Sequence, residues 1–256
     1  MRRVTDSIVA VGLVLAAIAV SGTAFAQGRT RPRVLVVNVP DVNHPTSGPA
    51  GVVAIREFAA VDNYDVDECT DYGRFTDQYL APYDAMVWTM AAPLTWTETS
   101  RAAFETFVKS GKGWVGLHVA ALTGISKTPW TWFEDYVGGL VFTGHPARQT
   151  ATVRLDKGAL NHPVLRGVDP VFRVWDEWYS WNKSPRSRQG LTVLATLDES
   201  TYNVGKLAMG DHPIAWISEQ PGRMMVAGFG HDPSVYRDPN VARLLRNAIV
   251  WAMTRR

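Results

Sequence analysis

The sequence has 256 residues, a formal net charge of +2 at pH 7 and a single cysteine, Cys69. A balanced charge without a cluster of lysines and arginines argues against nucleic-acid binding, so no nucleic-acid partner is expected. One cysteine excludes an internal disulfide, and a chain of this length can bury one large α/β core. We expect Cys69 to be structural, because no histidine lies near it in the sequence.

The N-terminal residues have the pattern of a secretory signal peptide. Two arginines precede an apolar run at residues 8–20, and an Ala-Phe-Ala cleavage sequence ends at Ala26. The apolar run is short for a membrane span, which needs about 20 residues. We therefore predict a signal peptide at residues 1–26, cleavage after Ala26, a periplasmic mature chain and no stable membrane insertion. An uncleaved N-terminal anchor is the alternative.

The first half of the mature chain alternates strands with helices. Residues 33–39 form a continuous apolar run, which is typical of a strand buried on both faces. The clearest helix runs over residues 97–110, between an N-cap at Thr97 and a stop at Gly111. This half also predicts helices at 52–62, 76–80 and 130–138 and strands at 64–69, 84–89 and 114–118. This spacing favours right-handed parallel βαβ units.

The second half is less regular but still predicts one continuous domain. Its expected strands lie at 149–155, 172–175, 191–197, 214–218 and 223–229, followed by an amphipathic helix at 240–253. Neither a repeat nor a long linker divides the chain, so the domain is expected to span residues 33–254. The predicted fold class is α/β, with three layers: an open, mostly parallel sheet and helices on both faces. The usual glycine-rich nucleotide loops are absent.

Histidines follow three predicted strands. His44 follows the first strand, His118 the fourth, and His231 the strand at 223–229. Because the carboxyl ends of parallel strands meet at one edge of a sheet, we expect these side chains to line one cleft. Small residues follow His118, as in the strand-to-helix turn that exposes a nucleophile in G-x-S-x-G enzymes. An imidazole at that turn can act as a base, an acid or a metal ligand.

The other histidines are weighed separately. His145 is a further candidate for the cleft, whereas His162 is expected to be a turn and packing residue. His212 precedes a predicted strand, which would place it at the opposite edge of the sheet. The alternative for each histidine is a loop residue that donates to a backbone carbonyl.

Two adjacent carboxylates lie in an aromatic segment at residues 174–181. Side chains alternate between the faces of a strand, so only one of Asp176 and Glu177 is expected to face a cleft. Aromatic surroundings raise the pKa of a carboxyl group toward the range that suits general acid–base work. The alternative is a carboxylate satisfied by a backbone amide or an arginine. The aromatic residues expected to offer stacking faces to a sugar are Trp130, Trp132, Trp178 and Tyr179.

Several motifs, in order along the chain, resemble the ThuA-like family, which is named for trehalose utilisation. They include Gly-Lys-Gly-Trp-Val-Gly-Leu-His-Val-Ala at 111–120, Trp-Phe-Glu-Asp-Tyr-Val-Gly-Gly at 132–139, Phe-Thr-Gly-His-Pro at 142–146 and Asp-Glu-Trp-Tyr at 176–179. The resemblance implies a fold like that of class I glutamine amidotransferases, within the flavodoxin-like group. His118 stands where those enzymes carry a cysteine nucleophile, so amide transfer is not expected. The family's association with disaccharide and keto-sugar metabolism implies a carbohydrate ligand.

The leading hypothesis is a secreted carbohydrate-processing enzyme that acts on a glycoside or a 3-keto sugar or disaccharide. The predicted catalytic residues are His118, Asp176 and Glu177, and the histidines predicted to bind substrate are His44, His145 and His231. The alternatives are a non-catalytic sugar-binding module and a metal-dependent hydrolase. No cofactor is certain, because no pair shows the His-x-x-x-His spacing of zinc sites. A divalent metal, if bound, would use His118, His145, His231 and Glu177. A homo-oligomer stays an open alternative.

Overall fold

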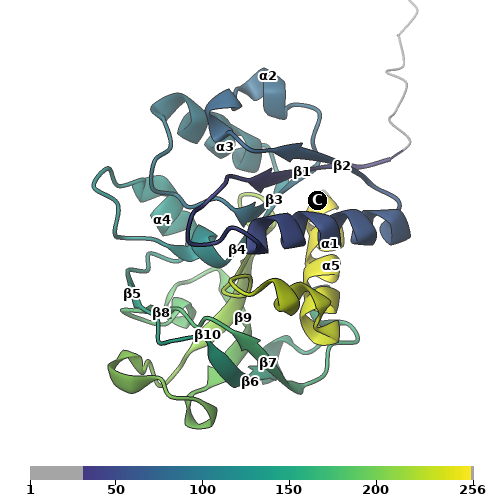
Figure 1. Cartoon of the computed structure of the whole chain (residues 1–256). Coiled ribbons are helices and arrows are strands. Elements are labelled where there is room, and N and C mark those ends of the chain that lie inside the picture. The colour runs from purple at the N-terminus through teal and green to yellow at the C-terminus, as the bar shows by residue number, and fades with distance from the viewer. Residues whose placement is uncertain (1–30, 255–256) are drawn as a thin grey trace, which may run out of the picture. The chain divides into compact units, whose positions relative to one another are not determined.

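The computed structural model describes residues 31–254, which form an α/β domain around one large sheet (Figure 1). The predicted signal peptide at residues 1–26 lies outside this range. Within it, none of the helices combines the length and apolar character that crossing a bilayer would require.

The large sheet has nine strands in the order β2-β1-β3-β4-β11-β10-β9-β6-β7. Neighbouring strands from β2 to β11 pair in parallel, and those from β11 to β7 pair antiparallel. Their bounds are β1 (Arg33–Asn38), β2 (Asp65–Cys69), β3 (Ala85–Met90), β4 (Gly113–Leu117), β6 (Gln149–Leu155), β7 (Val171–Asp176), β9 (Leu191–Asp198), β10 (Pro213–Ser218) and β11 (Met224–Ala227). The predicted fold class is confirmed, and the antiparallel strands account for the less regular second half of the sequence.

Helices cover both faces of this sheet, as predicted. Val34 and Val36 of β1 pack into a cluster with residues of α1 (Ser47–Asp62) and α5 (Pro239–Met253). The alternate residues Leu35 and Val37 pack on the other side with residues of α2 (Asp77–Leu80), α3 (Glu98–Lys109) and α4 (Thr131–Val137). Because successive strand side chains point to opposite faces, one apolar strand serves both cores. Figure 1 shows α1 beside α5, away from α3 and α4.

Local sequence explains where two helices begin. Thr97 caps α3, and its side chain accepts a hydrogen bond from the Ser100 amide, as predicted. Helix α1 begins at Ser47, five residues before the predicted start. Gly48, Pro49 and Gly51 hide this start in the sequence, although a proline fits the first turn of a helix, where no intrahelical N–H bond is lost.

Two short strands escaped prediction. Strand β5 (Phe142–Gly144) pairs antiparallel with β8 (Ser180–Trp181) in a separate two-stranded sheet. Strands of two or three residues are too short to show an alternating pattern. They matter for the site because β5 leads directly into His145 and β8 directly follows Tyr179.

The sheet topology brings four chain segments to one edge. β1, β4 and β11 run in the same direction, so the residues that follow them meet at their carboxyl ends. From β11, four successive antiparallel pairings restore that direction at β7. The residues after β7 therefore reach the same edge as those after the parallel strands.

Candidate active site

His118 occupies a tight turn directly after β4. Its φ of 44° lies in the left-handed region, and a short 3-10 helix begins at this residue. A left-handed non-glycine residue is strained, so the surrounding fold must hold it in place. Gly116 makes the turn feasible, because a Cβ there would lie 2.3 Å from the Trp114 ring and 2.9 Å from the Ala120 methyl. His118 thus places a fully buried imidazole at the predicted turn after the strand.

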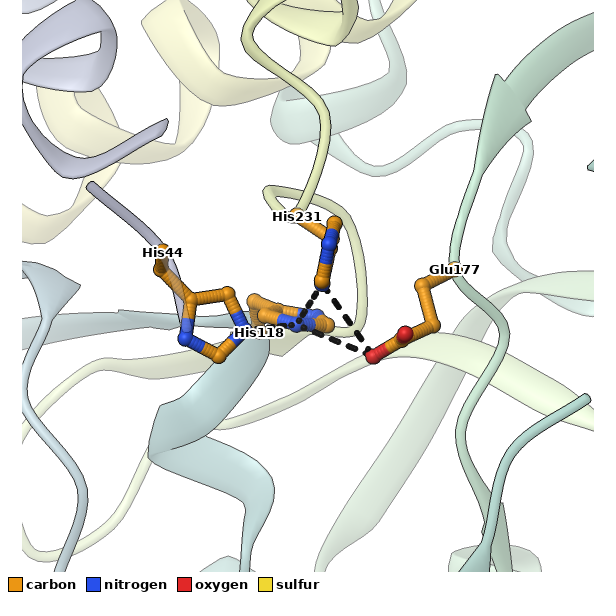
Figure 2. A group of neighbouring side chains, drawn as sticks. All are labelled: His44, His118, Glu177 and His231. Atoms are coloured by element: carbon orange, nitrogen blue, oxygen red, sulfur yellow. Dashed lines mark hydrogen bonds and ion pairs between the residues drawn. The ribbon is translucent and has the colours of Figure 1, made fainter. Parts of the chain in front are cut away.

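Three side chains, those of His44, Glu177 and His231, converge on His118 Nε2 (Figure 2). This atom lies 3.3 Å from His44 Nε2 and 3.3 Å from His231 Nδ1. It also lies 3.5 Å from Glu177 Oε2, which is 3.2 Å from His231 Nδ1. The four ligand-type atoms all lie within 4.8 Å of one another. We call these residues, His44, His118, Glu177 and His231, the four-residue cluster; the structure brings together the three strand-end histidines as expected.

Two histidines of this cluster, His118 and His231, have lowered pKa values that favour the neutral imidazole. Burial, followed by the proximity of His44 and His231, lowers the pKa of His118 well below its usual value. Burial, with His44 next in importance, lowers the pKa of His231 to about 4. Burial raises the pKa of Glu177, while His145 and Arg148 act in the opposite direction. Neutral imidazoles keep one nitrogen lone pair each, which is the form that binds a metal.

The adjacent carboxylates separate, as strand alternation predicted. Glu177 joins the cluster, whereas Asp176 is fully buried and accepts hydrogen bonds from the amides of Gly230 at 2.7 Å and Asp232 at 2.8 Å. These two amides flank His231. Asp176 is therefore not one of the cluster residues and instead holds the loop that carries His231, while its catalytic role stays a prediction.

His145 lies at the outer side of the cluster. Its Nδ1 is 3.1 Å from Glu177 Oε1, on the carboxylate oxygen that faces away from His118, and its side chain is 42% exposed. Its ring lies near that of Tyr179, whose ring centroid is 4.3 Å from that of His118. The group with metal-ligand spacing thus contains His44 in place of the predicted His145.

Three of the four predicted sugar-stacking residues do not line the site. Trp130 and Trp178 are 4% and 0% exposed and belong to the two cores. Trp132 stacks on Tyr136, which reaches the Gly222 carbonyl before β11, at the opposite edge of the sheet from His118. Large aromatic rings bury well, and burial has removed the faces of Trp130 and Trp178 from solvent. Only Tyr179 lies against the cluster.

The two remaining histidines have structural roles. His212 lies at the same edge as His118, contrary to prediction, because β10 runs antiparallel to β11. It is buried, and its ring nitrogens lie 2.8 Å from the Tyr179 carbonyl oxygen and 2.8 Å from Glu199 Oε1, so it fixes the backbone next to the site. His162 accepts a bond from the Val164 amide and packs on Trp251, as expected of a turn and packing residue.

The four-residue cluster has the chemistry of a metal centre. Imidazole nitrogens and a carboxylate oxygen are the ligands of Zn²⁺ and related divalent cations. Within residues 31–254 it is the one group of histidine, cysteine and acidic side chains that has this spacing. Sequence spacing could not show the set, because each ligand comes from a different segment. The available signal was a histidine after each of three strands.

Comparisons with known proteins bear on fold and family. The family model described as ThuA, trehalose utilisation, matches residues 33–252. A ThuA-like protein from Bacteroides uniformis ATCC 8492 is 27% identical, with a TM-score of 0.77, over 87% of this chain and 92% of that chain. A search of curated proteins found no match.

More distant structures share the fold alone. The glutaminase domain of Trypanosoma brucei CTPS, solved with acivicin bound, is 11% identical, with a TM-score of 0.52, over 86% of this chain and 94% of that chain. PurLQS from Thermotoga maritima is 9% identical, with a TM-score of 0.54, over 86% of this chain and 99% of that chain. The expected glutamine amidotransferase-like fold is confirmed by these structures.

Proposed function

We propose, for a chain that belongs to the ThuA or trehalose utilisation family, that it is a metal-dependent carbohydrate-processing enzyme. The substrate would be a glycoside or a 3-keto sugar, and the reaction hydrolysis or elimination at the glycosidic bond. The predicted signal peptide adds a periplasmic location to this proposal. The observation that carries it is the convergence of His44, His118, His231 and Glu177 on one point.

Hydrogen bonding alone does not account for this convergence. His118 Nδ1 lies 3.4 Å from the Gly228 carbonyl, which can only accept, so the ring N–H belongs at Nδ1 and the lone pair at Nε2. His44 Nδ1 lies 3.3 Å from Asp41 Oδ1 but makes no hydrogen bond there, so the His44 tautomer is not assigned by this contact. The single lone pair of His118 Nε2 then faces three groups, His44 Nε2 at 3.3 Å, His231 Nδ1 at 3.3 Å and Glu177 Oε2 at 3.5 Å, which is more than one lone pair can bond. A divalent cation held by these residues would use the His118 Nε2 lone pair as a ligand.

The residues around the cation would then have distinct tasks. A divalent cation bound by the cluster would supply a Lewis acid for a sugar hydroxyl or carbonyl oxygen. His145 is the exposed titratable side chain next to Glu177, and it would hold or move a proton at the substrate oxygen. Tyr179, which is 2% exposed, closes the inner wall beside His118 and would exclude water from that side.

The proposal is tested by metal-dependent turnover. Protein stripped with a chelator should not cleave a panel of glucosides and their 3-keto forms, and added Zn²⁺, Mn²⁺ or Co²⁺ should restore cleavage. Glu177→Gln should stay inactive because it loses the anionic ligand. Glu98→Gln is the matched control, since the Glu98 side chain is 91% exposed.

Two outcomes would contradict the proposal. Full activity of the stripped protein would remove the metal from the mechanism. Binding of these sugars without any turnover, in the presence of each metal, would favour the sugar-binding module that the sequence left open.

A further inference from the structure

Trp175 offers an aromatic face to solvent near the site. It is 46% exposed and is the one aromatic side chain among the large apolar residues that are exposed within residues 31–254. It lies near the end of β7, where Val171, Arg173 and Trp175 point outward and the alternate residues are buried. Only one residue, Asp176, separates it from Glu177. A half-exposed indole lacks part of the favourable free energy that full burial would give. A ligand that covered its exposed face would therefore be stabilised by contact with it.

A polar network ties Trp175 to the loop that carries His231. The Asp232 amide donates to Asp176 Oδ1 at 2.8 Å, and Asp176 directly follows Trp175 in the chain. Asp232 Oδ2 in turn lies 3.2 Å from Arg148 Nη1. We call Trp175, Asp232 and Arg148 the Trp175 rim.

The residues of this rim are neighbours, in the chain or in strand pairing, of residues in the four-residue cluster. Asp232 directly follows His231, and its amide shares the Asp176 carboxylate with the Gly230 amide. In the antiparallel pair of β6 and β7, Gln149 is opposite Asp176, so the preceding residue Arg148 lies beside the position of Glu177. The rim therefore adjoins the reacting centre, yet it contributes none of its ligands.

The chemistry of the rim matches a sugar ring. A pyranose presents an apolar C–H face that packs on an aromatic ring, and hydroxyl groups at its edge that bond charged side chains. Trp175 supplies the aromatic face, and Arg148 and Asp232 supply a donor and an acceptor beside it. We propose that the Trp175 rim is a second sugar subsite, which holds the ring of a disaccharide that does not react. This inference rests on the proposed function and specifies a two-ring substrate.

The test compares one-ring and two-ring sugars on the metal-loaded full chain. The probes are trehalose and its 3-keto form, against methyl α-glucoside and its 3-keto form, measured by calorimetry. Trp175→Ala should weaken binding of the two-ring probes roughly three- to tenfold, the range expected for one lost aromatic stacking partner, and leave the one-ring probes unchanged. Trp175→Phe keeps an aromatic face and should recover most of the affinity. Val171→Ala, also exposed on β7, is the control.

The outcomes separate this inference from the proposed function. If wild-type protein binds the two-ring probes and Trp175→Ala binds them equally well, the second subsite is wrong and the proposed function stands. An equal loss for one-ring and two-ring probes would also overturn it, because the rim would then serve the reacting ring. If wild-type protein binds none of the four probes, both the carbohydrate proposal and the subsite fail.

Discussion

Asp176 serves the site without facing it. Its carboxylate accepts the amides on both sides of His231, so the position of that imidazole depends on a residue behind the loop. Metal sites commonly depend on such outer contacts, which orient the ligands. Glu177 is the next residue, and its side chain points to the opposite side of the segment, where it joins the cluster. Adjacent acidic residues thus have separate roles.

The buried state of Asp176 predicts a pH dependence of stability. Burial raises its pKa from 3.8 to about 7, although the Gly230 and Asp232 amides act to lower it. A carboxyl group whose pKa is raised by folding stabilises the fold below the unfolded value, and this contribution is lost as the pH rises through the folded value. In metal-free protein, the free energy of unfolding should therefore fall between about pH 4 and about pH 7. The contribution of this group is about 4 kcal/mol.

Urea denaturation of metal-free wild type and Asp176→Asn checks this dependence. The variant lacks the titrating group, so its stability relative to wild type should increase with pH over that range. Glu98→Gln, at an exposed carboxylate of α3, is the control for a carboxylate-to-amide change outside the site. Parallel curves for wild type and Asp176→Asn would contradict the assignment.

At the level of single residues, the sequence predicted which histidines come together better than it predicted which aromatic side chains are buried. His44, His118 and His231 were expected to meet because each follows a strand, and the sheet brings those ends together. Trp130 and Trp178 were misassigned because the sequence does not distinguish an aromatic ring in a core from one in a cleft. His145 and His44 both follow strands, and only the three-dimensional register shows which one reaches His118 Nε2.

At the level of elements, two tight backbone positions hold the cluster together. His118 has φ 44°, and Gly230, in the neighbouring loop, has φ 130°. A Cβ on Gly230 would lie 2.9 Å from the Tyr236 hydroxyl and 3.3 Å from His118 Cβ. The loop that contains Gly230 can therefore pass close to the turn at His118 only because residue 230 lacks a side chain.

Gly230→Ala should thus damage both stability and metal binding. Backbone strain at such a position costs about 1–3 kcal/mol, and the clash with Tyr236 and His118 should also displace His231. Gly190→Ala is the matched control, since Gly190 has φ 87° and nothing within 4 Å of a built Cβ. Both variants should lose stability in urea, but only Gly230→Ala should lose metal affinity. Unchanged metal affinity of Gly230→Ala would show that the close approach does not position the cluster.

Strand direction was the main element-level property that the sequence did not reveal. The hydrophobic pattern of β10 is the same whether the strand runs parallel or antiparallel to its neighbours. His212 was therefore placed at the wrong edge, although the strand itself was predicted. The parallel half was easier, because strands joined by helices at regular spacing favour one topology and one handedness.

At the level of the whole molecule, the cluster joins distant parts of one chain. His44 follows β1, His118 follows β4, Glu177 follows β7 and His231 follows β11, so the site exists only when both halves of the sheet are assembled. A ligand that binds only this folded arrangement must stabilise it. The fold class was predictable from the first half of the sequence, whereas the antiparallel half that delivers Glu177 was not.

The central claim is that these four side chains bind one divalent cation. Titration of chelator-stripped protein with Co²⁺, followed by visible absorption, tests it most directly. We expect a saturable band at one equivalent of Co²⁺, and an affinity lowered at least about a hundredfold in Glu177→Gln, because even outer-shell changes cost about 10–100-fold. Glu98→Gln should titrate like wild type. Absence of a saturable band in wild type, or an identical titration of Glu177→Gln, would contradict the account.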